Sequence, residues 1–297
     1  MQQEEGTFQG AGGLNLYYQS WHPSGKVRGI LGIVHGLGGY SGTFGRVVDY
    51  LIAKDYAVYG FDLRGHGRSP GQRAYINTWS EFREDLSAFL RLIEMHEPDC
   101  PRFLLGHSLG GVIVLDYVLR SAKGLLGERP QKKLQGVIVT APALGRVGVP
   151  AWRLTLGWIL SWLWPRFSLD TGINLAVVSR EPEILEAYEK DPLMHSKGTA
   201  RLATEFFTTL AWIRDRIADL QVPILILQGG ADRVTFPEST RHFFEQITFP
   251  DKELREYSES YHEIYNDLDY QQMLIDLGNW LERHLQGEAT QSSSAQI

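Results

Sequence analysis

Short apolar runs alternate with amphipathic stretches along this chain, and the alternation restricts the folds that are open to it. The runs that are typical of strands occupy residues 14–18, 29–34, 57–61, 103–105, 135–140, 222–227 and 253–257, the first of them with the alternation of an edge strand. The stretches with apolar residues at helical spacing occupy 44–54, 78–94, 109–119, 238–246 and 270–284. This order predicts an α/β fold, with a mostly parallel central sheet and helices on both faces.

The alternation is interrupted once, after Ala141-Pro142, and resumes at Val222. About 80 residues with a mostly helical pattern lie between, and a structureless loop of that length would be unusual inside a compact domain. We therefore expect a core formed by 1–140 and 222–285, with a helical cap (lid) inserted at 141–221. The residues of 286–297 are rich in Ser, Gln and Ala, and we expect this tail to be disordered.

Composition excludes several classes of protein. Hydrophobic residues at 43% and charged residues at 22% are typical of a globular domain. A net charge of −6 argues against a nucleic-acid partner, which requires a basic face. The single cysteine, Cys100, cannot form an internal disulfide, and the acidic, polar start of the chain is unlike a secretory signal. We therefore expect a cytoplasmic protein.

Half of the tryptophans lie in one part of the predicted insertion. Four of the eight in the chain are Trp152, Trp158, Trp162 and Trp164, and the surrounding residues 149–165 are nearly all apolar. This stretch is shorter than the ~20 apolar residues that usually span a bilayer. We interpret it as a buried or interfacial helix.

One serine lies in a pattern that suits a nucleophile. Residues 106–110 read Gly-His-Ser-Leu-Gly and match G-x-S-x-G, a motif that chance supplies in about one chain of this length in ten. Its context is more specific, because an apolar strand leads into the motif and an apolar helix begins directly after it. This is the arrangement of a nucleophile elbow, which would present Ser108 at the carboxyl edge of the sheet.

A nucleophilic serine needs an imidazole to take its proton and a carboxylate to orient that imidazole. After a nucleophile elbow, the acid precedes the histidine in the chain. Only His262 lies in a loop after a predicted strand, and Asp232 follows the preceding strand through glycines. The other later histidines lie in the insertion or in predicted helices: His195, His242 and His284. The predicted triad is therefore Ser108, Asp232 and His262.

Acyl transfer also requires two amide donors for the oxyanion of the tetrahedral intermediate. One is the residue after the nucleophile, here Leu109, and the other comes from a loop after an earlier strand. The loop 35–39, His-Gly-Leu-Gly-Gly, makes Leu37 the expected second donor, and we expect the side chain of His35 to be structural. This chemistry requires no metal ion or organic cofactor, and we expect none.

Two further patterns have more than one interpretation. Residues 62–69, Asp-Leu-Arg-Gly-His-Gly-Arg-Ser, follow a strand and suggest either a phosphate or metal site or, as we favour, a tight glycine turn packed beside the active site. His262 and Asp267 form a His-x4-Asp pair of the kind that some acyltransferases use, although such a pair is common by chance.

Together these motifs resemble the monoglyceride lipase and lysophospholipase branch of the α/β-hydrolase superfamily, also called serine aminopeptidase-like hydrolases. The resemblance extends from about Gly29 to Trp280. Its further anchors are Asp191-Pro192-Leu193, residues 228–233 and residues 261–263. It implies an α/β-hydrolase fold with a helical cap, Ser108 as nucleophile and hydrolysis of a single-chain acyl ester.

The chain differs from the animal monoglyceride lipases at the residues that bind the head group of the substrate. Those enzymes carry a Glu and an Arg that help to place the glycerol hydroxyls, and the matching residues here are Gly39 and Thr43. Those enzymes also carry a polar His a few residues beyond the catalytic one, and Tyr265 takes its place here. Their cap cysteine corresponds to His195, and their cysteine beside the catalytic acid corresponds to Thr235. The resemblance thus extends to the triad and the oxyanion hole but not to glycerol recognition.

We therefore expect a serine carboxylic ester hydrolase that cleaves single-chain lipid esters, above all monoacylglycerol to fatty acid and glycerol. A lysophospholipase is the main alternative, and an acyltransferase or an aminopeptidase would use the same triad. A peptidase would also need a carboxylate in the cap to hold a free amino terminus. The candidates for that role are Glu181, Glu183, Glu186 and Glu189.

The tryptophan-rich stretch has a place in this scheme. We expect Trp158 and Trp162 to line the entry of the acyl chain and to contact membrane or micelle surfaces transiently, because an indole is apolar but carries an N–H group. The protein would then be cytoplasmic and peripheral at membranes. The alternative is that these tryptophans only bind the cap to the core.

Overall fold

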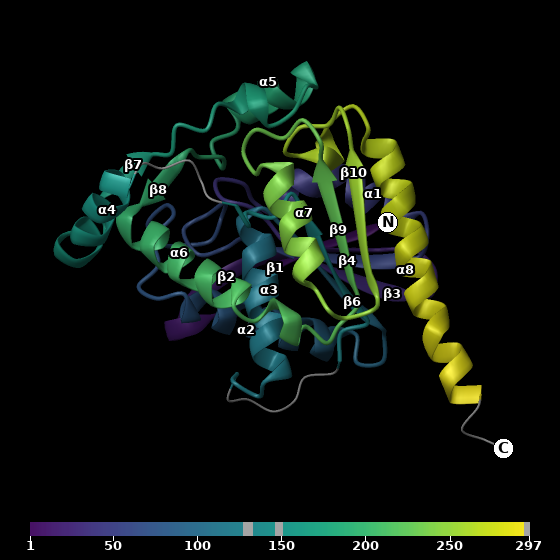
Figure 1. Cartoon of the computed structure of the whole chain (residues 1–297). Helices are drawn as coiled ribbons and strands as arrows, with labels where there is room; N and C mark the ends of the chain where they lie inside the picture. The colour runs from purple at the N-terminus through teal and green to yellow at the C-terminus, as the bar shows by residue number, and fades with distance from the viewer. Residues whose placement is uncertain (127–132, 146–150, 294–297) are drawn as a thin grey trace.

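The computed structural model describes residues 1–126, 133–145 and 151–293, and describes only the backbone of 151–156 and 286–293. In these residues the centre is an eight-stranded sheet of order β1-β2-β4-β3-β5-β6-β9-β10 (Figure 1). The strands are β1 (Gln2–Gln9), β2 (Asn15–His22), β3 (Gly29–Val34), β4 (Tyr56–Phe61), β5 (Arg102–His107), β6 (Gly136–Thr140), β9 (Ile224–Gly229) and β10 (Lys252–Tyr257). The six strands from β4 to β10 pair in parallel, whereas β1 and β2 are antiparallel to their neighbours.

Helices cover both faces of this sheet, as the alternation predicts. They are α1 (Gly45–Ile52), α2 (Ser80–His96), α3 (Leu109–Ala122), α7 (Pro237–Gln246) and α8 (Tyr270–Ser293). Leu31 of β3 belongs to an apolar cluster with Trp280 of α8, on one face. Its neighbour Ile30 belongs to the cluster of Phe89 of α2, on the other face. Successive strand residues point to opposite faces, so the sheet separates two apolar layers.

The first strand differs from the expectation. Residues 15–22 form the second strand and not an edge strand, because β1 pairs with β2 along its whole length. Most side chains of β1 are exposed, and Phe8 is its one buried residue. The strand therefore lacks the apolar alternation by which the sequence reveals the others. Its polar side chains suit the edge of a sheet, where they discourage pairing with another chain.

The described part of the predicted insertion contains helices and, unlike the expectation, a small sheet of β7 and β8. Its elements are α4 (Ala151–Leu163), β7 (Ser168–Asp170), α5 (Pro182–Lys190), β8 (Lys197–Thr199) and α6 (Ala200–Arg214). In Figure 1, α5 lies beyond the carboxyl ends of β9 and β10, and α4 lies at one end of the molecule.

Helix α4 carries the tryptophan-rich stretch and packs on α6. The hydroxyl of Ser161 is buried in this contact and lies 2.8 Å from Oγ1 of Thr204. The other side of α4 is open to solvent, since Trp158 is 53% and Trp162 80% exposed. Among the described residues, therefore, the buried interpretation of this helix is wrong, and the interfacial one stays a prediction. The side chain of Trp152 lies outside the described residues.

A helix needs about 20 mostly apolar residues to span a bilayer. In the part of the chain that the structure describes, no helix is long and apolar enough to cross a bilayer. Helix α8 extends to Ser293, and residues 294–297 lie outside the described residues. The disorder expected for the tail 286–297 stays a prediction.

Candidate active site

Ser108 occupies the turn between β5 and α3, at the carboxyl edge of the sheet. Its backbone has φ 52° and ψ −114°, which is a strained conformation for a residue with a side chain. The two glycines of the motif permit this turn. A Cβ on Gly106 would lie 2.4 Å from the carbonyl oxygen of Gly110, and a Cβ on Gly110 would lie 2.1 Å from that of Val34. The motif therefore has the strand–turn–helix geometry of a nucleophile elbow.

His262 and Asp232 meet beside this turn, in the loops that follow β10 and β9. The Nδ1 atom of His262 lies 2.8 Å from Oδ2 of Asp232, and both side chains are buried. His262 and Ser108 line the same cavity. The fold thus brings together the three residues that the sequence predicts as a triad.

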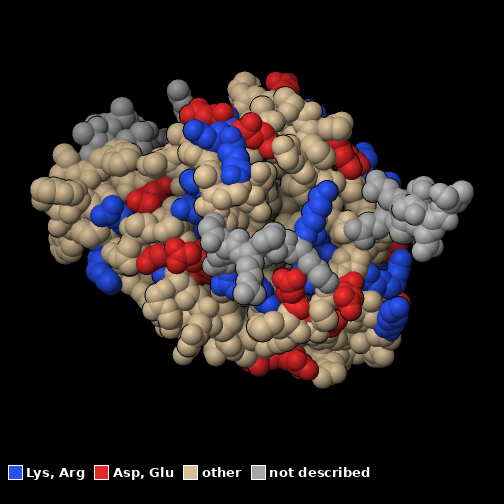
Figure 2. Space-filling view, turned by 90° about the horizontal axis from the view of Figure 1, so that it is seen from below, with Lys and Arg blue, Asp and Glu red and all other residues tan. Residues whose placement is uncertain are grey.

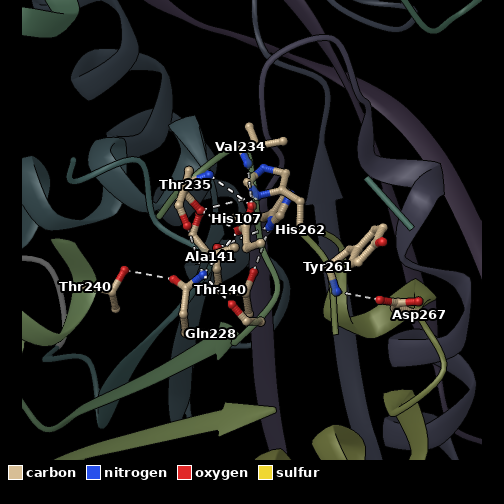
Figure 3. Close-up of polar contacts among 12 residues, drawn as sticks. His107, Thr140, Ala141, Gln228, Val234, Thr235, Thr240, Tyr261, His262 and Asp267 are labelled. Atoms are coloured by element: carbon tan, nitrogen blue, oxygen red, sulfur yellow. Dashed lines mark hydrogen bonds and ion pairs between the residues drawn. The ribbon is translucent and has the colours of Figure 1, made fainter. Parts of the chain in front are cut away.

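Hydrogen bonds from three residues, all of them labelled in Figure 3, hold the carboxylate of Asp232. Thr235 donates its hydroxyl to Oδ2 at 2.6 Å and its N–H to Oδ1 at 2.9 Å. Val234 donates its N–H to Oδ1 at 2.7 Å, and Gln228 donates from Nε2 to Oδ2 at 3.1 Å. Burial by itself would raise the pKa of Asp232, but His262 and the bonds from Thr235 outweigh it and hold the pKa below its usual value. An ionised Asp232 keeps Nδ1 of His262 protonated and so fixes its tautomer.

The residues that hold Asp232 in place were not predicted from the sequence. Gln228 lies in β9 and is fully buried, and its Oε1 accepts the hydroxyl of Thr240 at 2.8 Å (Figure 3). Buried polar groups are nearly always hydrogen-bonded. A single glutamine in the apolar run 224–229 was therefore the signal that a polar network lies at the end of this strand.

His107 packs against the other side of the predicted catalytic histidine. The centroid of its ring lies 4.8 Å from that of His262, and its Nδ1 lies 3.0 Å from Oγ1 of Thr140. Burial, and then the neighbouring His262, hold the pKa of His107 well below its usual value. The ring therefore stays neutral and adds no positive charge beside the triad.

Of the two residues expected to form the oxyanion hole, one follows Ser108 in the chain and the other lines the cavity with it. Leu109 is the first residue of α3, where N–H groups have no partner within a helix. Leu37 follows β3 and lines the cavity together with Ser108. Neither amide donates a hydrogen bond to another described residue. Their role as oxyanion donors remains a prediction.

The loop 62–69 is a tight turn beside the site. The carboxylate of Asp62 accepts the backbone N–H groups of Ser41 and Arg68, each at 2.8 Å. His35 accepts the N–H of Leu63 on its Nε2 at 2.9 Å. These side chains bind the backbone of neighbouring loops, which agrees with the structural interpretation of His35 and of this loop.

Asp267 does not pair with His262. Its Oδ2 accepts the N–H of Tyr261 at 2.5 Å, and its Oδ1 accepts that of Arg180 at 2.9 Å. Figure 3 shows Asp267 beside the backbone of Tyr261. The His-x4-Asp pattern therefore reflects a loop contact in this chain.

A cavity of about 350 Å³ opens onto Ser108 and His262. Part of its wall comes from the predicted insertion, including Ile173, Leu175, Val178, Tyr188, Glu189, Asp191, Met194 and His195. Hydrogen bonds join this wall to the core. The N–H of His195 donates to the carbonyl of Gly38 at 3.0 Å, and the hydroxyl of Tyr40 donates to Oδ2 of Asp191 at 2.7 Å.

The expectation that Trp158 and Trp162 line the acyl entry needs correction. Neither residue is among those that line the cavity. The side of α4 that carries Ser161 faces α6, which leaves both tryptophans on the solvent side. The apolar wall comes instead from the segment between α4 and α5, with Ile173, Leu175 and Val178.

The sheet order and the Ser–His–Asp arrangement define an α/β-hydrolase. A family model described as "Hydrolase_4: Serine aminopeptidase, S33" matches residues 25–269, and the chain belongs to this family. A monoacylglycerol lipase of Mycolicibacterium smegmatis is 30% identical, over 95% of this chain and 98% of its own length. Phospholipase YtpA of Bacillus subtilis is 26% identical, over 80% of this chain and 89% of its own.

A solved structure agrees with these relatives. The crystal structure of the monoacylglycerol lipase of Paleococcus ferrophilus has a TM-score of 0.79 and 31% identity, and the match covers 91% of this chain and 99% of that one. The resemblance to the monoglyceride lipase branch of the α/β-hydrolases and the prediction of a serine ester hydrolase are thereby confirmed.

Proposed function

We propose that the protein hydrolyses monoacylglycerol to a fatty acid and glycerol, with Ser108, Asp232 and His262 as its catalytic triad. The observation that carries the proposal is the 2.8 Å contact between His262 and Asp232, next to a cavity that reaches Ser108. The monoacylglycerol lipases that match more than nine-tenths of this chain support the choice of substrate.

In the proposed reaction, His262 takes the proton of Ser108 as the hydroxyl oxygen attacks the ester carbonyl. The amides of Leu37 and Leu109 stabilise the oxyanion. His262 then protonates the leaving alcohol, and the same imidazole activates a water molecule that releases the fatty acid from the acyl-enzyme. Asp232 stabilises the imidazolium that forms in both steps.

We propose that the segment 141–221 is the cap of this site. Its apolar residues Ile173, Leu175 and Val178 line the cavity with the nucleophile. Burial of each CH2 group of an acyl chain against such residues contributes about 0.8 kcal/mol. A cavity of about 350 Å³ suits one acyl chain, which supports a single-chain ester as substrate.

A substrate panel tests the proposed activity. We would measure kcat/KM for a monoacylglycerol, for the lysophosphatidylcholine with the same acyl chain and for an amino-acid arylamide. We expect the monoacylglycerol to react fastest, and Ser108→Ala to lower its turnover by about 10⁴-fold or more. Full esterase activity in Ser108→Ala would overturn the mechanism.

The other members of the panel represent the rival activities. Lysophospholipase activity has the support of the phospholipase from Bacillus subtilis, and aminopeptidase activity has the support of Glu189, which lines the cavity. Of the other candidate glutamates, Glu186 is exposed and pairs with Lys190. If the lysophospholipid or the arylamide had a higher kcat/KM than the monoacylglycerol, that compound would represent the substrate class of the protein.

We also propose that α4 contacts lipid surfaces transiently, which would make the protein peripheral at membranes. Trp158, Trp162, Leu163 and Trp164 are each more than half exposed. In Figure 2 uncharged side chains dominate the end of the molecule where Figure 1 places α4, while positive and negative side chains are mixed over the rest of that face. An exposed apolar group of this kind is typical of an interaction surface.

Vesicle binding tests the contact. We expect the double variant Trp158→Ser, Trp162→Ser to bind phosphatidylcholine vesicles about tenfold more weakly, which corresponds to ~1.4 kcal/mol. It should lose activity on long-chain substrate in vesicles but not on a soluble short-chain ester. The control is Met95→Ser in α2, which removes an equally exposed apolar side chain and should leave binding unchanged. Equal activity of the double variant and the unmodified protein on both substrates would refute the proposal.

A further inference from the structure

A buried polar cluster lies directly beside the predicted catalytic histidine, and the proposed mechanism does not use it. The cluster consists of Glu263, Tyr188 and Asn266. Tyr188 donates its hydroxyl to Oε2 of Glu263 at 2.5 Å. The Nδ2 atom of Asn266 lies 3.2 Å from the same oxygen and 3.0 Å from the carbonyl oxygen of Thr43. The N–H of Glu263 donates to the carbonyl of Val178 at 2.9 Å, so the cluster joins the predicted cap to the core.

The two carboxylate oxygens of Glu263 differ. Both side-chain donors of the cluster reach Oε2, whereas Oε1 accepts no hydrogen bond from any described residue. Glu263 and Tyr188 both line the cavity that contains Ser108. This oxygen is not one of the fully buried side-chain atoms that lack a hydrogen-bond partner, so it is open to the cavity and can accept a hydrogen bond from a ligand that enters it.

The reaction itself indicates which part of a substrate lies here. His262 would protonate the alcohol oxygen as it leaves, so the alcohol portion of the ester must lie beside this imidazole. Glu263 is the next residue in the chain and lines the same cavity. The hydroxyls of a polyol alcohol would therefore lie within reach of Oε1.

We propose that Glu263 is a specificity-determining residue that accepts a hydrogen bond from a free hydroxyl of the leaving alcohol. The inference rests on the proposed function, because it concerns the alcohol that the same triad releases. A hydroxyl bonded to a carboxylate forms a charge-assisted hydrogen bond. An anionic phosphate in that position would instead place two like charges together. Glu263 thus selects esters of neutral polyols over esters with anionic head groups.

The test compares two esters of one fatty acid, the monoacylglycerol and the methyl ester, which differ by the polyol hydroxyls. The readout is the ratio of their kcat/KM values. We expect Glu263→Gln to lower this ratio about tenfold, because a neutral amide replaces the charge-assisted acceptor. Glu186→Gln is the control, since it makes the same change at an exposed glutamate of the insertion that does not line the cavity, and it should leave the ratio unchanged.

An equal loss on both esters in Glu263→Gln would assign the residue to positioning His262 and overturn the inference, and so would an unchanged ratio. Failure of the proposed function is seen separately, because the unmodified protein would then not hydrolyse monoacylglycerol.

A second measurement does not depend on the folding of a variant. The unmodified protein is assayed on the monoacylglycerol and on its analogue with both free hydroxyls O-methylated. We expect a kcat/KM about tenfold lower for the analogue, because it has no hydroxyl to donate. Equal values for the two esters would contradict the role of Glu263.

Discussion

The core and the inserted segment 141–221 are built in different ways. In the core, Asp232 accepts hydrogen bonds from Thr235, Val234 and Gln228, and the elbow leaves no space for a Cβ at Gly110. In the insertion, Gly157 of α4 has open space around it and Trp162 is 80% exposed. The difference indicates that the core holds the catalytic geometry, whereas the insertion supplies apolar surface and joins the core through polar contacts at its inner side.

The largest expected effect concerns the acid of the triad. Asp232→Asn should lower kcat by about 10⁴-fold, because the amide can donate to Nδ1 and then favours the wrong tautomer of His262. The matched change in the insertion is Asp170→Asn, at an exposed aspartate of β7, and it should leave kcat unchanged. Steady-state kinetics on a soluble short-chain ester measures both. Similar losses in the two variants would remove the distinction between the core and the insertion.

The same substitution at two glycines tests the difference in packing. Gly110→Ala places a Cβ 2.1 Å from the carbonyl oxygen of Val34 and should destabilise the protein by about 3 kcal/mol. Gly157→Ala meets no atom within 4 Å and should stabilise α4 by about 0.5–1 kcal/mol. Urea unfolding gives both free energies. A destabilised Gly157→Ala would show that α4 is packed more tightly than the structure indicates.

The contact of His195 with the core should make stability depend on pH. Burial, and then the nearby Arg73, lower the pKa of His195 from 6.5 to about 4. The unfolded chain therefore binds more protons than the folded one between these values, and stability falls as the pH decreases through this window. His195→Gln lacks this titration, so its free energy of unfolding should fall less between about pH 7 and pH 4.5. Parallel curves for the variant and the unmodified protein would contradict the prediction.

The smallest effect concerns the hydroxyl of Tyr40, which directly follows the loop 35–39 and joins it to the insertion. Tyr40→Phe removes the 2.7 Å hydrogen bond to Asp191 and should cost about 1 kcal/mol of stability. Tyr75→Phe is the control, because its hydroxyl bonds Asn77 at an exposed position. Thermal unfolding would detect the difference. If Tyr75→Phe lost as much stability as Tyr40→Phe, the hydrogen bond to the insertion would contribute no more stability than an exposed one.

The sequence by itself determined which segments form β3, β4, β5, β6, β9 and β10 and where the elbow at Ser108 lies, and it predicted Asp232 and His262 as the partners of that serine. These features follow from local rules. Strands and helices have their own periods, a nucleophile elbow needs small residues at defined positions, and parallel strands bring their carboxyl ends to one edge. Each rule acts over a few consecutive residues, so one chain is sufficient to apply it.

Only the tertiary structure decided which way α4 turns its tryptophans, where the polar strand β1 pairs and what surrounds Glu263. Tyr188 lies 75 residues before Glu263 in the chain, and neither residue belongs to a periodic pattern that points to the other. The orientation of α4 likewise depends on the contact between Ser161 and Thr204, which lie 43 residues apart in the chain. Contacts of this kind are set by the packing of distant segments, which composition and spacing do not reveal.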